Sequence, residues 1–78
     1  MEEFPKEYFF QIQENRDLEV VIIVGFENFK ALYWVECNLL VKQSRKIFRV
    51  LGKKFNIPDE EFALSEGMRI YRDFLDSK

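Results

Sequence analysis

The feature that most constrains the fold is the run L-E-V-V-I-I-V-G-F at residues 18–26, which is rich in β-branched side chains. Such residues favour strands, and after Glu19 the run is apolar at consecutive rather than alternate positions. This pattern is typical of a strand that is central in its sheet or covered on both faces. We therefore expect residues 18–26 to form the strand around which the fold is built.

Strands are predicted on both sides of this run. Residues 7–14 read E-Y-F-F-Q-I-Q-E, with the two-residue alternation of a half-buried strand, and Asn15 to Asp17 supply turn residues.

Residues 31–42 fit either a strand or a helix. A strand would place one set of side chains on a single face: Ala31, Tyr33, Val35, Cys37, Leu39 and Val41. A helix would instead align Phe29, Tyr33, Cys37 and Leu40. We favour the strand, because Tyr-Trp-Val is β-prone and two strands alone are only marginally stable.

From Ser44 onwards the spacing predicts helices. Ser44 can cap a helix, and the apolar residues that follow fall on one helical face: Ile47, Val50, Leu51 and Phe55. Pro58 and the acids after it suit the first turn of a second helix, which is expected to reach about residue 75. Gly67 lies within that pattern, where it either permits close packing or breaks the helix.

The elements together predict a single α+β domain over residues 1–78. Its architecture is expected to be a small antiparallel three-stranded meander followed by two helices packed on one face of the sheet. The expected strands cover about residues 7–14, 18–26 and 31–42, and the expected helices about residues 44–55 and 58–75.

The composition argues against catalysis. The chain has no histidine, which is the commonest general base, and no glycine-rich phosphate motif. Its single cysteine, Cys37, falls among alternating apolar residues, which favours a buried structural thiol. We therefore expect no enzyme activity, no catalytic residues, no metal, no cofactor and no small-molecule substrate.

The sequence also bears on location. The first residues are acidic and precede no long apolar segment, so no export signal is expected. The longest apolar run, residues 20–26, is far short of the roughly 20 residues that span a bilayer. A lone thiol fits a reducing compartment. These patterns predict a cytoplasmic protein without a membrane partner.

Surplus apolar surface is the first candidate for binding. If the helices cover one face of the sheet, the other face carries a second apolar set: Phe9, Val21, Ile23, Leu32, Trp34 and Leu40. Contiguous exposed apolar patches usually mark interfaces, and a chain this short gains stability by associating. A symmetric dimer is the default form of self-association.

A basic stripe is the second candidate. Residues 42–54 contain cations and no anion, and in a helix five of the cations would fall within an arc of about 100°: Lys42, Arg45, Lys46, Arg49 and Lys53. Such a face could bind phosphates or an acidic protein, although we favour the simpler interpretation, which is a solvated helix face. The favoured function is a small non-catalytic protein-interaction or regulatory module that binds itself or another protein through apolar surface. The alternative is a nucleic-acid-binding regulator that uses the basic face.

Overall fold

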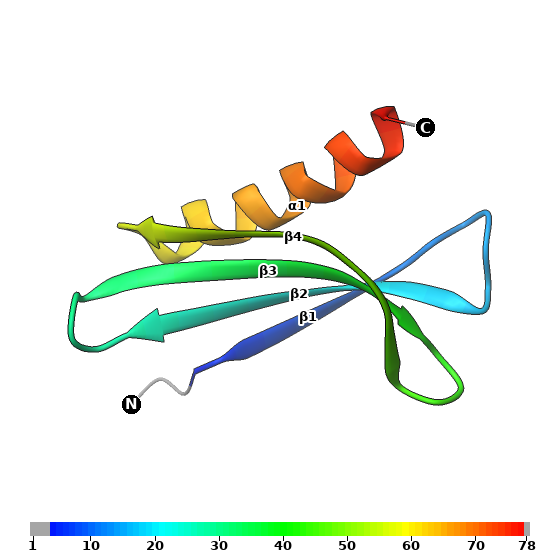
Figure 1. The fold of residues 1–78 in the computed structure, drawn as a ribbon, viewed down its shortest axis with the longest axis horizontal. Coiled ribbons are helices and arrows are strands. Elements are labelled where there is room, and N and C mark those ends of the chain that lie inside the picture. The colour runs from blue at the N-terminus through cyan, green and yellow to red at the C-terminus, as the bar shows by residue number, and fades with distance from the viewer. Residues whose placement is uncertain (1–3, 78) are drawn as a thin grey trace.

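The computed structural model describes residues 4–77; the acidic residues 1–3, which entered the export-signal argument, and residue 78 lie outside the described residues. The chain forms four strands and one helix: β1 (Lys6–Gln11), β2 (Leu18–Glu27), β3 (Leu32–Val41), β4 (Lys46–Ile57) and α1 (Glu60–Asp76). The strands make one antiparallel sheet in the order β1-β2-β3-β4, so each strand pairs with its neighbours in the chain (Figure 1). The fold class is α+β.

The predicted architecture of three strands and two helices is wrong. The expected helix at residues 44–55 is replaced by β4, the longest strand, and only one helix follows the sheet. The ambiguous residues 31–42 contain β3, which is a strand in the middle of the sheet. The helix expected at residues 58–75 corresponds to α1, which begins after the N-cap Asp59, whose side chain accepts a hydrogen bond from the backbone N–H of Phe62.

The register of β4 explains the error. Three irregularities interrupt its pairing with β3, and each leaves an extra residue on β4. Ile47, Val50 and Lys53 consequently pair with Leu40, Asn38 and Glu36, which are alternate residues of β3. Side chains three residues apart on β4 therefore share a face. This spacing resembles that of a helix, and it is the spacing on which the helical prediction rested.

The main core lies between the sheet and α1. The helix packs against β2, β3 and β4, and its residues meet a buried set from the sheet that includes Val20, Ile22, Val24, Val35 and Cys37. Gly67 does not break α1 but lies buried within it, where a Cβ atom would come within 2.5 Å of the Ile22 side chain. The glycine therefore allows the helix backbone to approach the centre of the sheet closely.

Candidate functional site on the open face of the sheet

The face of the sheet opposite α1 is called the open face here, because no helix covers it in residues 4–77. Strand alternation and pairing place the whole predicted apolar interface on this face: Phe9, Val21, Ile23, Leu32, Trp34 and Leu40. The structure thus brings these residues together on three adjacent strands. Whether they bind a partner stays a prediction.

Exposure is uneven across the open face. Val21 and Leu40 are buried, although nothing from α1 lies over them, whereas Phe9 is 44% exposed. The most exposed apolar side chains here include Ile47 and Val50 of β4, at 54% and 52%. The sequence interpretation had assigned both to a helix and so left them out of the interface. Ile47 and Val50 are three residues apart, which is also the spacing of same-face residues in a bulged strand. That interpretation would have placed both residues on this face.

A hollow of about 320 Å³ lies in the open face. Its walls are apolar side chains from all four strands: Phe9, Val21, Ile23, Leu40 and Ile47. The polar residues that line it are Asn38, Glu7 and Arg45. Apolar walls with a few placed polar groups are the usual composition of a binding pocket.

Asn38 is the unusual residue of this hollow, because it is a fully buried amide in the middle of a central strand. Its Nδ2 donates a hydrogen bond of 2.7 Å to Oε2 of Glu36, and Nζ of Lys53 lies 3.2 Å from the other oxygen of the same carboxylate. The amide is therefore held in one orientation. Its Oδ1 has no hydrogen-bond partner among the described residues. A buried acceptor without a partner costs about 1–3 kcal/mol, so Asn38 weakens the folded chain where an apolar residue would not.

Arg45 forms one side of the same surface. It donates a hydrogen bond to Oε1 of the largely buried Glu19, and its guanidinium lies 4.9 Å from the centre of the Phe9 ring. Arg45 itself has a positive φ of 59° in the turn between β3 and β4. The cation is thus already paired within the chain and stacks on the aromatic ring at the edge of the hollow.

Trp34 covers another part of the open face. It pairs across the sheet with Gly25, and its ring occupies the space that a side chain at position 25 would fill. An ideal Cβ on Gly25 would lie 2.0 Å from Cε2 and 2.3 Å from Nε1 of the indole. An aromatic ring over a cross-strand glycine is a recognised way to shield strand backbone.

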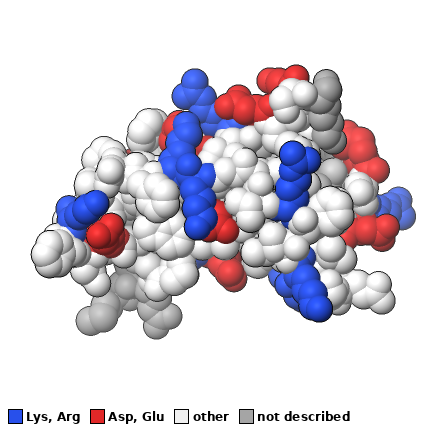
Figure 2. All heavy atoms as spheres, in the orientation of Figure 1, with Lys and Arg blue, Asp and Glu red and all other residues white. Residues whose placement is uncertain are grey.

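The basic stripe does not form as predicted, because its residues lie in a turn and a strand instead of a helix. Arg45 and Lys53 face the open side and pair with Glu19 and Glu36. Arg49 faces the other side, where its guanidinium lies 5.3 Å from the Phe74 ring of α1. Lys42 lies in the turn after β3 and Lys46 opens β4. Figure 2 shows cations and anions interspersed on the face it presents. The single helical face behind the nucleic-acid alternative is therefore absent from the described residues.

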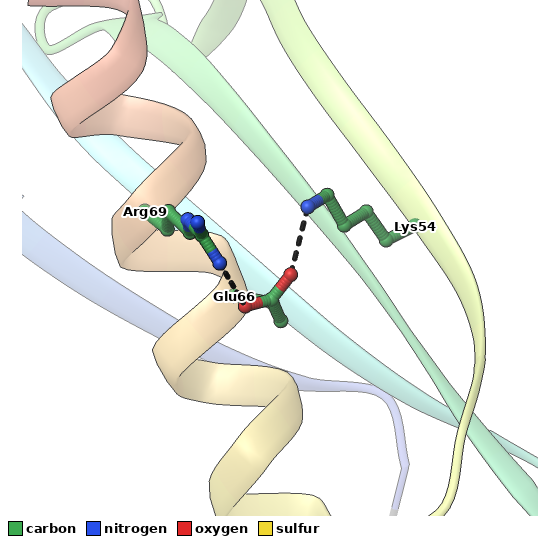
Figure 3. A network of polar contacts seen from close by, with 3 residues as sticks. All are labelled: Lys54, Glu66 and Arg69. Carbon is green, nitrogen blue, oxygen red and sulfur yellow. Dashed lines mark hydrogen bonds and ion pairs between the residues drawn. The ribbon is translucent and has the colours of Figure 1, made fainter.

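A separate polar network joins α1 to β4 on the covered side of the sheet (Figure 3). Glu66 is a buried carboxylate that accepts a hydrogen bond of 2.7 Å from Nζ of Lys54, and Nη1 of Arg69 lies 3.6 Å from its second oxygen. The hydrogen bond from Lys54, helped by both positive charges and opposed by desolvation, holds the pKa of Glu66 below its ordinary value. This network ties the helix to the edge strand.

The lowered pKa of Glu66 predicts a contribution to stability that depends on pH. The contribution is fully present above the ordinary carboxyl pKa and is lost as the pH falls through the folded pKa, because the folded state then has to protonate a paired carboxylate. We expect Glu66→Gln to flatten the acid side of the stability profile, measured by urea unfolding at a series of pH values. Lys54→Met should flatten it similarly, and the double variant should add little. An unchanged acid profile in Glu66→Gln would contradict this assignment.

The part of the chain that the structure describes contains neither a reactive thiol nor a cluster of metal-ligating side chains. Cys37 is buried in the core, and desolvation raises the pKa of its thiol to about 11, so it is protonated at neutral pH and a poor nucleophile. No group of three or more metal-ligating side chains gathers among residues 4–77. Within the same residues, α1 is not long and apolar enough to cross a bilayer.

A second, more apolar hollow lies beside α1 on the covered side. It has a volume of about 360 Å³ and lies between β1, β2 and the helix, with Phe10 and Val20 on the sheet and Met68 and Tyr71 on the helix. It forms because α1 packs against β2, β3 and β4 and leaves β1 uncovered. Its lining contains no buried polar atom without a partner among the described residues.

Comparisons with protein-family models, with curated proteins and with solved structures found no match to this chain. The functional argument therefore rests on the open face itself.

Proposed function

We propose that the protein is a small non-catalytic interaction module, and that the partner on its open face is a second copy of the same chain. The observation that carries the proposal is the apolar surface left on one side of the sheet, where Phe9, Ile47 and Val50 are each about half exposed. Exposed apolar patches of this kind usually mark interfaces. The buried Cys37 thiol fits the reducing interior of a cell, where we place the protein.

The charges on the open face support a second copy as the occupant. Glu7 and Glu36 carry negative charge there, and Arg45 and Lys53 carry positive charge. A surface with both signs can complement itself when two copies meet about a two-fold axis, because each copy presents the same groups to the other. A partner of one charge sign would meet repulsion from half of these residues.

The size of the face is also adequate. Four strands of six to twelve residues, spaced about 4.8 Å apart, give a flat footprint of roughly 600 Å². Stable interfaces bury about 800 Å² per partner, which is of similar size. Face-to-face packing of two such sheets therefore supplies an interface of ordinary dimensions.

The test is the mass of the protein in solution, measured by sedimentation over a wide concentration range. We expect a dimer of twice the 9.5 kDa chain mass. Phe9→Glu should raise the dissociation constant by roughly 30-fold or more, because it puts a charge on the apolar surface where Phe9 is 44% exposed.

Phe10→Glu is the matched control, since Phe10 is the next residue, has a similar exposure of 38% and lies on the opposite face of β1. Each new carboxylate also has an arginine nearby, Arg45 on the open face and Arg72 beside the second hollow. A monomer at every concentration would overturn the proposal. Equal disruption by both variants would also overturn it and would move the interface to the groove beside α1.

A further inference from the structure

The outer edge of β1 differs from the outer edge of β4. β1 is the first strand of the sheet, and its backbone lies against β2 alone among the described strands and helix (Figure 1). Its pairing with β2 runs without a break from Lys6 to Gln11, whereas the pairing of β4 is irregular. In an antiparallel sheet, alternate residues of an edge strand direct their N–H and C=O groups away from the sheet. The β1 edge therefore presents a regular row of backbone groups.

This edge lacks the usual protection against pairing. Charged side chains, proline and bulges normally prevent a further strand from adding to a sheet. Residues 8–11 of β1 read Y-F-F-Q and carry no charge, and Phe9 and Phe10 are 44% and 38% exposed. Extended peptides bind to unprotected edges of this kind by adding a strand, and pockets for alternate side chains then give specificity.

The second hollow lies next to this edge. It occupies about 360 Å³ between β1, β2 and α1, on the covered side of the sheet. Tyr8 and Phe10 project to the same side, because they pair with the core residues Ile22 and Val20. Directly opposite side chains of paired strands have Cβ atoms about 5 Å apart. A strand added to β1 would therefore place alternate side chains beside Tyr8 and Phe10, where a large apolar one can reach the hollow.

Arg72 indicates the charge that suits this place. It lines the second hollow and is exposed. The ion pairs that join described residues use other cations: Lys6, Arg45, Lys53, Lys54 and Arg69. A carboxylate beside the hollow would complement Arg72. β1 of a second copy would bring Lys6, Tyr8 and Phe10 to this side and no anion, so the charge favours a different protein.

We propose that β1 is a docking edge for an extended segment of a different protein, which adds to the sheet as a fifth strand. On the covered side this segment places a large apolar side chain in the second hollow and pairs a carboxylate with Arg72. Main-chain hydrogen bonds to β1 supply affinity, and the apolar and acidic side chains supply specificity. The inference goes beyond the proposed self-association, because it concerns another surface and another partner.

Peptide selection tests the docking edge. The probe is a random library of displayed peptides of about ten residues, which is long enough for a strand, and the bait is the full chain. We expect enrichment of peptides with alternate apolar residues and an acidic residue on the face of the apolar anchor. With Arg72→Glu as bait, lysine or arginine should replace the acidic residue. No enrichment of peptides with this pattern by the wild-type chain would overturn the proposal.

The affinity of one enriched peptide, labelled with a fluorophore, tests the role of Arg72. Arg72→Glu should raise its dissociation constant roughly 10-fold, because repulsion replaces attraction. Arg49→Glu is the matched control, since it makes the same change of charge on the covered side but on β4, at the other edge of the sheet. We expect that control to stay within roughly twofold of the wild-type chain. Equal weakening by both variants would overturn the pairing with Arg72.

Hydrogen exchange separates strand addition from binding by side chains alone. The bound peptide should slow exchange at alternate backbone amides of β1, which are those that face away from β2. Unchanged exchange in β1 with the peptide bound would overturn strand addition.

Sedimentation with saturating peptide separates this inference from the proposed function. A dimer that persists with peptide bound supports two separate surfaces. Conversion of dimers to monomers by the peptide would mean that a second copy holds the β1 edge, and would overturn the proposal of a different protein. A wild-type chain that is monomeric at all concentrations and still binds the peptide would support this inference and overturn the self-association.

Discussion

Gly67→Ala is expected to lower the free energy of unfolding by about 2 kcal/mol, although alanine is the better helix former by about 1 kcal/mol. The new Cβ atom would lie 2.5 Å from Cγ2 of Ile22 and 2.9 Å from Cγ2 of Val35, and both of these side chains are fully buried. Neither can move without displacing other core atoms, so α1 has to rise from the sheet. Chemical denaturation monitored by circular dichroism measures the loss.

Gly52→Ala is the control for this prediction. Gly52 lies on β4 against the same helix, but its added Cβ would lie 3.1 Å from Cγ2 of Ile70, which is only partly buried. Since that side chain can move by a few tenths of an ångström, we expect a change within about 1 kcal/mol. If Gly67→Ala proved as mild as Gly52→Ala, the close approach of α1 to the sheet would be disproved.

Gly25→Ala is expected to displace Trp34 from the open face. The Cβ atom would overlap the indole, with Cε2 only 2.0 Å away, so the ring has to rotate off the strand backbone. We expect a loss of about 1–3 kcal/mol of stability and a shift of the tryptophan emission to longer wavelength. Fluorescence reports the movement directly, because the chain contains one tryptophan.

The pairing of Gly25 with Trp34 can be isolated by a second substitution. In a Trp34→Ala background the space over Gly25 is empty, so Gly25→Ala should cost little or should even stabilise the strand. The two substitutions should therefore be strongly non-additive in urea unfolding. Additive effects would mean that the ring does not occupy this space in solution.

Residues 18–26 show what the sequence could predict about the fold. Their apolar side chains at consecutive positions indicated a strand that buries both faces, and β2 is an inner strand of the sheet. The α+β class followed from the order of the patterns. The number of helices could not be predicted in this way. The bulges of β4 place side chains on the same face at every third residue between Ile47 and Lys53, instead of at every second residue. A bulged edge strand and an amphipathic helix then have similar spacing.

The sequence predicted the candidate site only in part. Alternation placed Phe9 and Trp34 on the same face of the sheet, since it depends only on local geometry. Which of these side chains are exposed depends on the residues beside them: Val21 is buried, whereas Phe9, its partner on β1, is 44% exposed. The sequence could not predict that Oδ1 of Asn38 is buried without a hydrogen-bond partner, because this depends on the positions of all the neighbouring polar groups.

The irregular register of β4 has a consequence for the addition of further chains at this edge of the sheet. An edge strand with unpaired backbone groups is a template to which further chains can add without limit, as they do in fibrils. The irregular pairing of β4 with β3 disturbs the flat edge that an added strand needs, and its cations repel an identical strand: Lys46, Arg49, Lys53 and Lys54. The proposed association through the open face would close after two copies. The β4 edge is thus a poor template for extending the sheet from one molecule to the next.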